Sequence, residues 1–140
     1  MDTIYAANGL TIYADAAQRC LLIDWQGKHS GPEKEACCQH IVQAIHRTQS
    51  TKMLVDGSHD LDTWAEAVHW IGHEYYHTLL ASSLEAVAWV LPRNVRALAD
   101  VNRVLSIVHH LKNRPNQQLV IDTFHDIESA HAWLHRLVGA

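Results

Sequence analysis

Alternating hydrophobic and polar residues mark the first part of the chain. Residues 10–14 (LTIYA) alternate, residues 15–19 (DAAQR) interrupt the pattern, and residues 20–25 (CLLIDW) resume it before Gly27. A period of two residues is typical of strands, because successive side chains of a strand point to opposite faces. The sequence therefore predicts an N-terminal antiparallel hairpin.

After the hairpin, amphipathic helices alternate with short apolar runs. A helix start is indicated by Ser30-Gly31-Pro32, and apolar residues then recur at the helical period as far as Thr48. Further strands are predicted at residues 52–56, 85–91 and 118–122, and further helices at about 62–81, 95–111 and 127–137, the last capped by Asp126. Apolar strands separated by helices are typical of parallel sheets. We therefore expect an α/β fold with a mixed, mostly parallel sheet of four to five strands and about four helices.

Composition narrows the class of protein. The length of 140 residues suits a single domain spanning 1–140. With 11 Lys+Arg against 15 Asp+Glu, the net charge is -4 and no basic cluster is present, which argues against a nucleic-acid partner. The three cysteines form no disulfide framework, no apolar run is long enough to span a membrane, and the N-terminus lacks the features of a signal peptide. We therefore expect a cytoplasmic protein with reduced thiols.

One segment matches a catalytic motif. Residues 73–77 (HEYYH) fit the H-E-x-x-H pattern, in which two histidines one helical turn apart hold zinc and the glutamate polarises water. The H-x-x-G-x-x-H extension is missing, and on a helical wheel His69, His73 and His77 lie opposite the apolar face. The pattern favours solvated histidines and no resident cofactor. Adventitious zinc or nickel binding by His69/His73 or His73/His77, or a zinc hydrolase using His73 and His77, are the alternatives.

Two aspartates end predicted strands. Asp56 closes the strand at 52–56, and Asp122 closes the strand at 118–122. Open α/β sheets bind ligands outside the carboxyl ends of their strands, so both aspartates are candidate ligand-binding residues. Aspartates in such places also serve as turn and capping residues. Gly57 stands alone, so the sequence contains no Gly-rich phosphate-binding loop.

An ordered set of features resembles a known family. The set comprises Trp25-Gln26-Gly27, Leu54-Val55-Asp56, the helix opening near Trp64 with Glu74 further along, residues 88–92 (AWVLP), and F-x-D-I-x-x-A-x-x-W-L over residues 124–134. In this order they resemble the small bacterial STAS-like (SpoIIAA-like) proteins over nearly the whole chain. The resemblance implies helices packed against a sheet. It also implies a non-enzymatic domain that serves regulation, partner docking or the holding of a small apolar or lipid-like ligand.

The resemblance also implies candidate phosphosites. In the anti-anti-sigma-factor branch of the family, a serine in a turn at a helix start is phosphorylated. The corresponding residues 56–63 (DGSHDLDT) offer Ser58 and Thr63 as hydroxyls, and Ser58 is also a candidate ligand-binding residue. A phosphate at Thr63 would lie at a helix N-terminus, which favours it, but beside Asp60 and Asp62, which repel it.

Large apolar side chains supply the last candidates. Trp25 and Trp89 fall on core-type strands, where framework packing is the default and a ligand pocket is the alternative. In the predicted helix 95–111, Leu98 and Leu105 widen the apolar stripe beyond what a one-sided surface helix needs. A bound lipid tail or a second subunit can cover the excess, and we expect a homodimer. The function classes that follow are a STAS-like regulatory or ligand-binding module, an interaction protein acting through its surfaces, and a zinc hydrolase.

Overall fold

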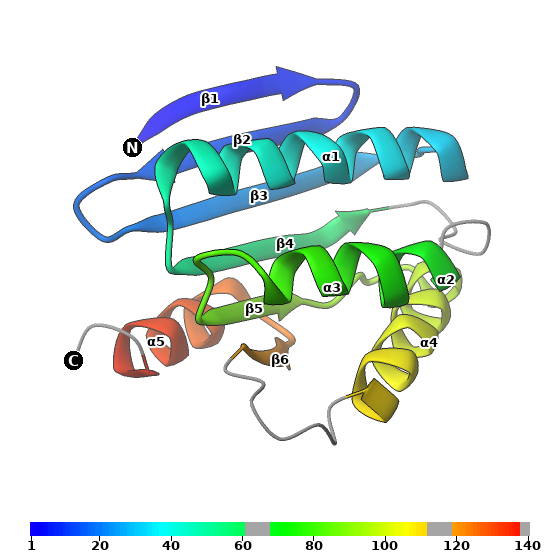
Figure 1. The fold of residues 1–140 in the computed structure, drawn as a ribbon. Helices are drawn as coiled ribbons and strands as arrows, with labels where there is room; N and C mark the ends of the chain where they lie inside the picture. The colour runs from blue at the N-terminus through cyan, green and yellow to red at the C-terminus, as the bar shows by residue number, and fades with distance from the viewer. Residues whose placement is uncertain (61–67, 112–118, 138–140) are drawn as a thin grey trace.

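The computed structural model describes residues 1–60, 68–111 and 119–137, which form a mixed six-stranded sheet with helices on both faces (Figure 1). The strands are β1 (Asp2–Ala7), β2 (Leu10–Asp15), β3 (Cys20–Gly27), β4 (Lys52–Asp60), β5 (Ala86–Val90) and β6 (Val120–Phe124). The helices are α1 (Gly31–Thr48), α2 (Val68–Trp70), the π-helix η1 (Ile71–Tyr75), α3 (Tyr76–Leu80), α4 (Val95–Leu111) and α5 (Ile127–Leu137).

The strands lie in the sheet in the order in which they occur along the chain, from β1 to β6. Strands β1, β2 and β3 pair antiparallel, whereas β3, β4, β5 and β6 pair parallel. The α/β class and the mixed sheet with an N-terminal antiparallel hairpin are confirmed. The predicted count of four to five strands is too low, because β1 also joins the sheet. As an edge strand with mostly exposed residues, β1 lacks the clear alternation that marks a half-buried strand.

The limits predicted for the strands that carry Asp56 and Asp122 are wrong. The strand that begins at Lys52 does not end at Asp56 but continues to Asp60, because β3 pairs with it as far as Gly27 opposite Asp60. Strand β6 covers Val120–Phe124 rather than residues 118–122. Asp56 and Asp122 therefore lie within strands and not at their ends. The predicted start of the helix at 62–81 lies outside the described residues, and its described part is the continuous α2, η1 and α3.

Local capping chemistry explains where the long helices begin. The Ser30 hydroxyl accepts a hydrogen bond from the Glu33 backbone N–H, and the Glu33 carboxylate accepts one from the Ser30 N–H, which together form a capping box at the start of α1. The Asp126 carboxylate accepts from the Ser129 N–H at the start of α5, as the sequence predicts. At the start of α4, the Asn94 side chain accepts from the Ala97 N–H.

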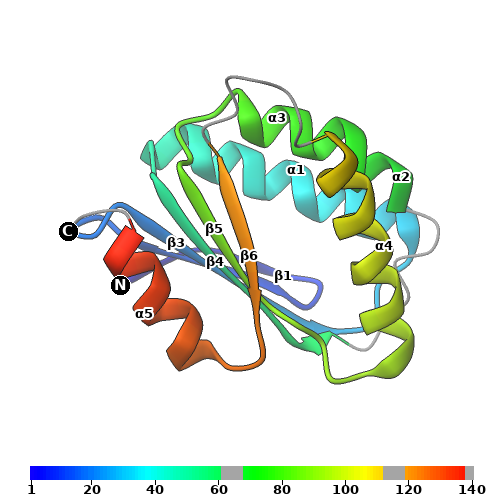
Figure 2. The same cartoon turned by 90° about the horizontal axis from the view of Figure 1, so that it is seen from below.

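The two faces of the sheet carry unequal helical layers. Helices α1, α2, α3 and α4 cover one face, and α5 alone packs on the other (Figure 2). The larger core lies under the first layer, with Trp25, Ile41 and Val104 among its buried members. The smaller core joins Ala130 and Leu134 of α5 to β4 and β5. Because one helix covers little of a six-stranded sheet, part of the second face is left open near β2 and β3. Within the described residues, no helix is long and apolar enough to cross a membrane.

Candidate functional site

Four polar residues meet where β3 and β4 run side by side, and we call them the β3–β4 polar cluster: Asp24, Asp56, Ser58 and His59. Asp24 and Asp56 are direct partners in the parallel register. Beyond this pair the register shifts, so that Gln26 of β3 lies opposite His59 of β4. A bulge of this kind re-aims side chains and is common next to functional sites. The bulge therefore accounts for His59 joining the two aspartates.

Hydrogen bonds hold the cluster together. The backbone N–H and the hydroxyl of Ser58 both donate to Asp56 Oδ1, at 3.0 and 2.6 Å. The Ser58 hydroxyl also lies 3.2 Å from His59 Nδ1. The Gln26 amide donates to Asp24 Oδ2 at 3.0 Å. Each side chain of the cluster is thus oriented by a neighbour.

Asp24 is the least satisfied member of the cluster. Its Oδ1 atom is buried and accepts no hydrogen bond. Burial, and to a smaller extent the Asp56 carboxylate, raise the pKa of Asp24, while the Gln26 amide and His59 oppose this shift. A buried carboxylate oxygen without a donor costs stability, and residues that cost stability are typical of functional sites.

The β3–β4 polar cluster has the composition of a cation site. One ligand atom each from Asp24, Asp56 and His59 lie within 4.8 Å of one another, and this is the only such group of three or more among the described residues. Two carboxylates and one imidazole suit a divalent cation that accepts oxygen and nitrogen ligands. His59 is exposed, so an ion can reach the cluster from solvent.

Replacing the Asp24 carboxylate by an amide is expected to stabilise the protein at neutral pH by about 1 kcal/mol or less. Folding raises the pKa of Asp24 above that of an aspartate in the unfolded chain. The ionised carboxylate therefore destabilises the folded state once the pH rises above the pKa of the unfolded chain, and this cost is absent below that pKa, where the group is protonated in both states. Asp24→Asn should therefore raise the melting temperature at pH 7, and the gain should vanish below about pH 4. Thermal unfolding monitored by circular dichroism measures this.

The control for that substitution is Asp2→Asn, which changes an exposed carboxylate on β1. It should leave the melting temperature nearly unchanged at both pH values, because surface substitutions have small effects. A destabilised Asp24→Asn at pH 7 would contradict the interpretation of Asp24 as a residue that costs stability.

A groove lies on the second face of the sheet between α5 and the β2–β3 hairpin, and we call it the α5 groove. Its volume is about 370 Å³, and its lining is mainly apolar. The lining residues are Met1, Asp15, Gln18, Cys20, Leu22, Leu54, Ile127, Glu128, His131, Ala132 and His135. Burial raises the pKa of the Cys20 thiol to about 11, although Lys52 lowers it. The thiol is therefore neutral at physiological pH and belongs to an apolar floor with Leu22 and Leu54.

Trp25 and Trp89 lie on the opposite face of the sheet. They line a cavity of about 50 Å³ within the larger core, next to Tyr75 and Val104. Small-molecule sites usually have volumes of about 300–1,000 Å³, so a cavity of this size does not admit a lipid tail. Trp25 is 1% exposed, as expected of a framework residue. Burial raises the pKa of the Tyr75 hydroxyl well above its ordinary value.

The H-E-x-x-H segment forms η1 and the start of α3. His69, His73 and His77 are all exposed, on the side away from the core, as the helical wheel predicts. The rings of His69 and His73 stack with their planes at 12° and their centroids 6.5 Å apart. In the described part of the chain, none of these histidines belongs to a group of three close metal-ligating atoms. The structure thus offers no third described ligand for a zinc hydrolase at this segment.

The remaining sequence candidates separate in space. Asp122 is exposed on β6, two strands away from β4, so it does not join the β3–β4 polar cluster. Ser58 does join it, but in a strand rather than a turn, and a phosphate there would face the carboxylates of Asp24 and Asp56. This environment disfavours a phosphoserine. Thr63 lies outside the described residues.

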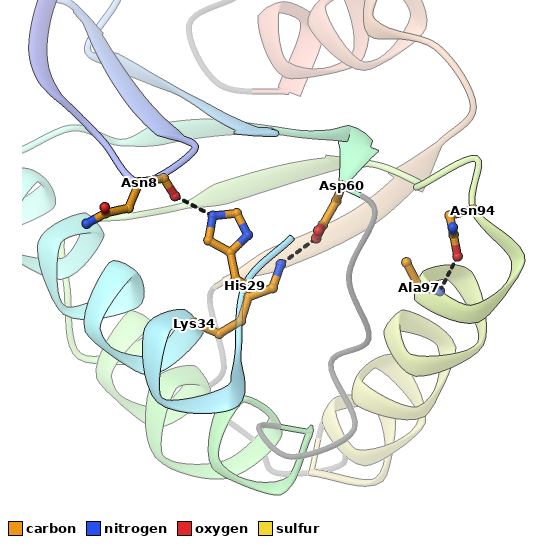
Figure 3. Close-up of polar contacts among 6 residues, drawn as sticks. All are labelled: Asn8, His29, Lys34, Asp60, Asn94 and Ala97. Carbon is orange, nitrogen blue, oxygen red and sulfur yellow. Dashed lines mark hydrogen bonds and ion pairs between the residues drawn. The ribbon is translucent and has the colours of Figure 1, made fainter. Parts of the chain in front are cut away.

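A buried ion pair was not anticipated from the sequence. Lys34 Nζ lies 2.5 Å from Asp60 Oδ2, and the two side chains are 0% and 1% exposed (Figure 3). The same ammonium lies 4.4 Å from the centroid of the Trp25 ring. His29 packs edge-on against that ring. Its Nε2 atom contacts the Asn8 carbonyl (Figure 3). These contacts fasten the start of α1 to the ends of β3 and β4.

Comparisons with known proteins do not add a family to this description. Neither a scan against the profiles of protein families nor a search of curated proteins found a match for the chain. The functional conclusions therefore depend on the geometry of the sites described above.

Proposed function

We propose that the chain is a non-enzymatic, STAS-like module that binds a small apolar ligand in the α5 groove. The observation that carries this proposal is the open volume of about 370 Å³ with a mainly apolar lining. That volume falls within the range of small-molecule sites, about 300–1,000 Å³. The N-terminal hairpin followed by parallel strands and helices supports the STAS-like part of the proposal, because the resemblance implies helices packed on such a sheet.

The volume and the lining of the groove suit an alkyl chain with a small polar head. Leu22 and Leu54 form an apolar floor on which a chain can bury methylene groups, each contributing about 0.8 kcal/mol when fully buried. Asp15, Glu128 and His135 form polar parts of the lining, where a hydroxyl can exchange hydrogen bonds. A neutral head group fits this mixture of acidic and imidazole side chains best.

The regulatory part of the proposal concerns what the ligand would control. A ligand in the α5 groove would contact both α5 and the sheet, so its binding would change the surface that a protein partner meets.

We also propose that the protein is cytoplasmic. The three cysteines support it, since Cys20, Cys37 and Cys38 are all free thiols and two of them are buried.

Filling the groove is the direct experiment. Ala132 is an exposed residue of α5 that lines the groove, so Ala132→Trp should occupy the ligand volume without disturbing the core. With octanol as the ligand and EDTA present, isothermal titration calorimetry should show affinity reduced by about tenfold or more, equivalent to about 1.4 kcal/mol. The matched control is Ala36→Trp, which adds the same ring to an exposed alanine of α1.

The control should bind octanol like the wild-type chain. Equal affinities in all three proteins would contradict binding in the α5 groove. Loss of binding in Ala36→Trp alone would indicate that the ligand binds in the helical layer on the other face.

We also propose that the module is a homodimer. Leu98 and Leu105 of α4 are only half-buried, and Val95 is 80% exposed, so apolar surface remains on this helix. Light scattering should report twice the chain mass of 15.8 kDa at micromolar concentration, and Leu105→Glu should give the monomer. A monomeric mass for the wild-type chain at all concentrations would contradict the dimer.

A further inference from the structure

Two histidines of α5 face each other in the α5 groove. His131 and His135 are one helical turn apart, their Nε2 atoms share a hydrogen bond of 3.0 Å in which either nitrogen can donate, and their ring centroids are 4.2 Å apart. Ala130 and Leu134, which directly precede the two histidines in the sequence, are buried against the sheet at 0% and 1% exposure. The imidazoles are therefore carried by an anchored element, as a preorganised site requires.

The separation of the two nitrogens matches that of a chelate. Two neighbouring imidazole ligands of one metal ion have nitrogens about 2.9–3.4 Å apart, from square to tetrahedral geometry, at the usual metal–nitrogen distance. The observed 3.0 Å lies in this range.

The groove provides space for the rest of a coordination sphere. Asp15 of β2 lines the groove together with the two histidines. Glu128 adds a further acidic group from α5. In the described part of the chain, no third side chain joins the two nitrogens in a group of ligand atoms within 4.8 Å. Water or a bound molecule would thus occupy the remaining positions.

Another histidine pair with the same spacing lacks this arrangement. His69 and His73 are also one turn apart, but their rings are nearly parallel and their centroids lie 6.5 Å apart. They are exposed and do not line the α5 groove. The difference comes from the orientation of the rings and not from the sequence spacing.

We propose that His131 and His135 chelate a divalent transition-metal ion of the zinc class, with its open coordination positions turned into the α5 groove. Imidazole nitrogen suits Zn²⁺, Ni²⁺ and Cu²⁺, whereas Mg²⁺ and Ca²⁺ prefer oxygen ligands. The inference goes beyond the proposed ligand-binding function and does not depend on it, since a metal can bind while water fills the groove.

Zinc titration of the full chain, freed of metal with EDTA and then of EDTA, tests the proposal. Isothermal titration with zinc chloride and no octanol should show a zinc site that depends on His131 and His135. His131→Ala and His135→Ala should each weaken it by about tenfold or more, because a chelate becomes a single imidazole ligand. The matched control, His69→Ala, should change the affinity by less than about twofold.

Three outcomes would overturn the proposal. The first is unchanged zinc affinity in His131→Ala and His135→Ala, and the second is an equal loss of affinity in His69→Ala. The third is a loss of affinity in Asp24→Asn, which would assign the ion to the β3–β4 polar cluster.

NMR spectra of the wild-type chain give a second readout, in which Cu²⁺ should broaden the backbone amide signals of residues 131–135 first. Broadening that begins at residues 69–77 would contradict the assignment to α5.

Discussion

Asp60→Asn is expected to lower the free energy of unfolding by about 3–5 kcal/mol, because it removes one charge of a buried ion pair. The Lys34 ammonium and the Asp60 carboxylate are 0% and 1% exposed and lie 2.5 Å apart. The substitution leaves a positive charge in a site from which water is excluded, and the amide offers it only a dipole. Urea unfolding of the wild-type and variant chains measures the difference.

The paired variant separates the charge from the packing. Replacing both residues with apolar ones of similar size, as Lys34→Met with Asp60→Leu, removes the buried charges together, and most of the lost stability should return. A loss of less than about 1 kcal/mol in Asp60→Asn is typical of solvent-exposed salt bridges, and it would contradict the role of Lys34 and Asp60 as a buried ion pair.

Trp25→Ala should also cost about 3–5 kcal/mol, because it opens a cavity in the larger core. The indole is 1% exposed, packs against the edge of His29 and lies under the Lys34 ammonium. Urea unfolding again gives the magnitude. Trp25→Phe, which keeps an aromatic face for the ammonium, should lose less than half as much.

Trp25→Ala also distinguishes a framework role of Trp25 from a ligand-binding role. Trp25 lies in the core under α1–α4, on the face of the sheet opposite the α5 groove. The folded fraction of Trp25→Ala should therefore bind octanol with the wild-type affinity. A variant of near-normal stability that failed to bind octanol would identify Trp25 as a ligand contact instead.

The helices were predictable because their signals are local. Apolar spacing and the Asp126 cap place the predicted helices 95–111 and 127–137 at the observed limits of α4 and α5. Strand limits were less predictable because they depend on partners distant in the chain. Gly57 to Asp60 look like a loop in sequence, yet they extend β4 because β3 supplies the hydrogen bonds across a bulge.

The candidate sites were predictable only in part, for a related reason. Asp56 was identified from its predicted strand position and Ser58 from the family resemblance. Their neighbour Asp24 was not identified, because the register between β3 and β4 cannot be read from either strand alone. Lys34 resembles a surface residue in the first turn of a helix until Asp60 is placed against it. His131 and His135 share their spacing with His69 and His73, and the two pairs differ in ring orientation, ring separation and position relative to the α5 groove.

The most direct test of the central claim is an octanol titration followed by amide chemical shifts in two-dimensional NMR spectra of the full chain. Binding in the α5 groove predicts progressive shifts for the groove residues Leu22, Leu54 and Ala132, with the core residues Ile41 and Val104 on the other face unaffected. Shifts confined to the helical layer of α1–α4, or no shifts at octanol concentrations near saturation, would contradict a ligand-binding module built around α5.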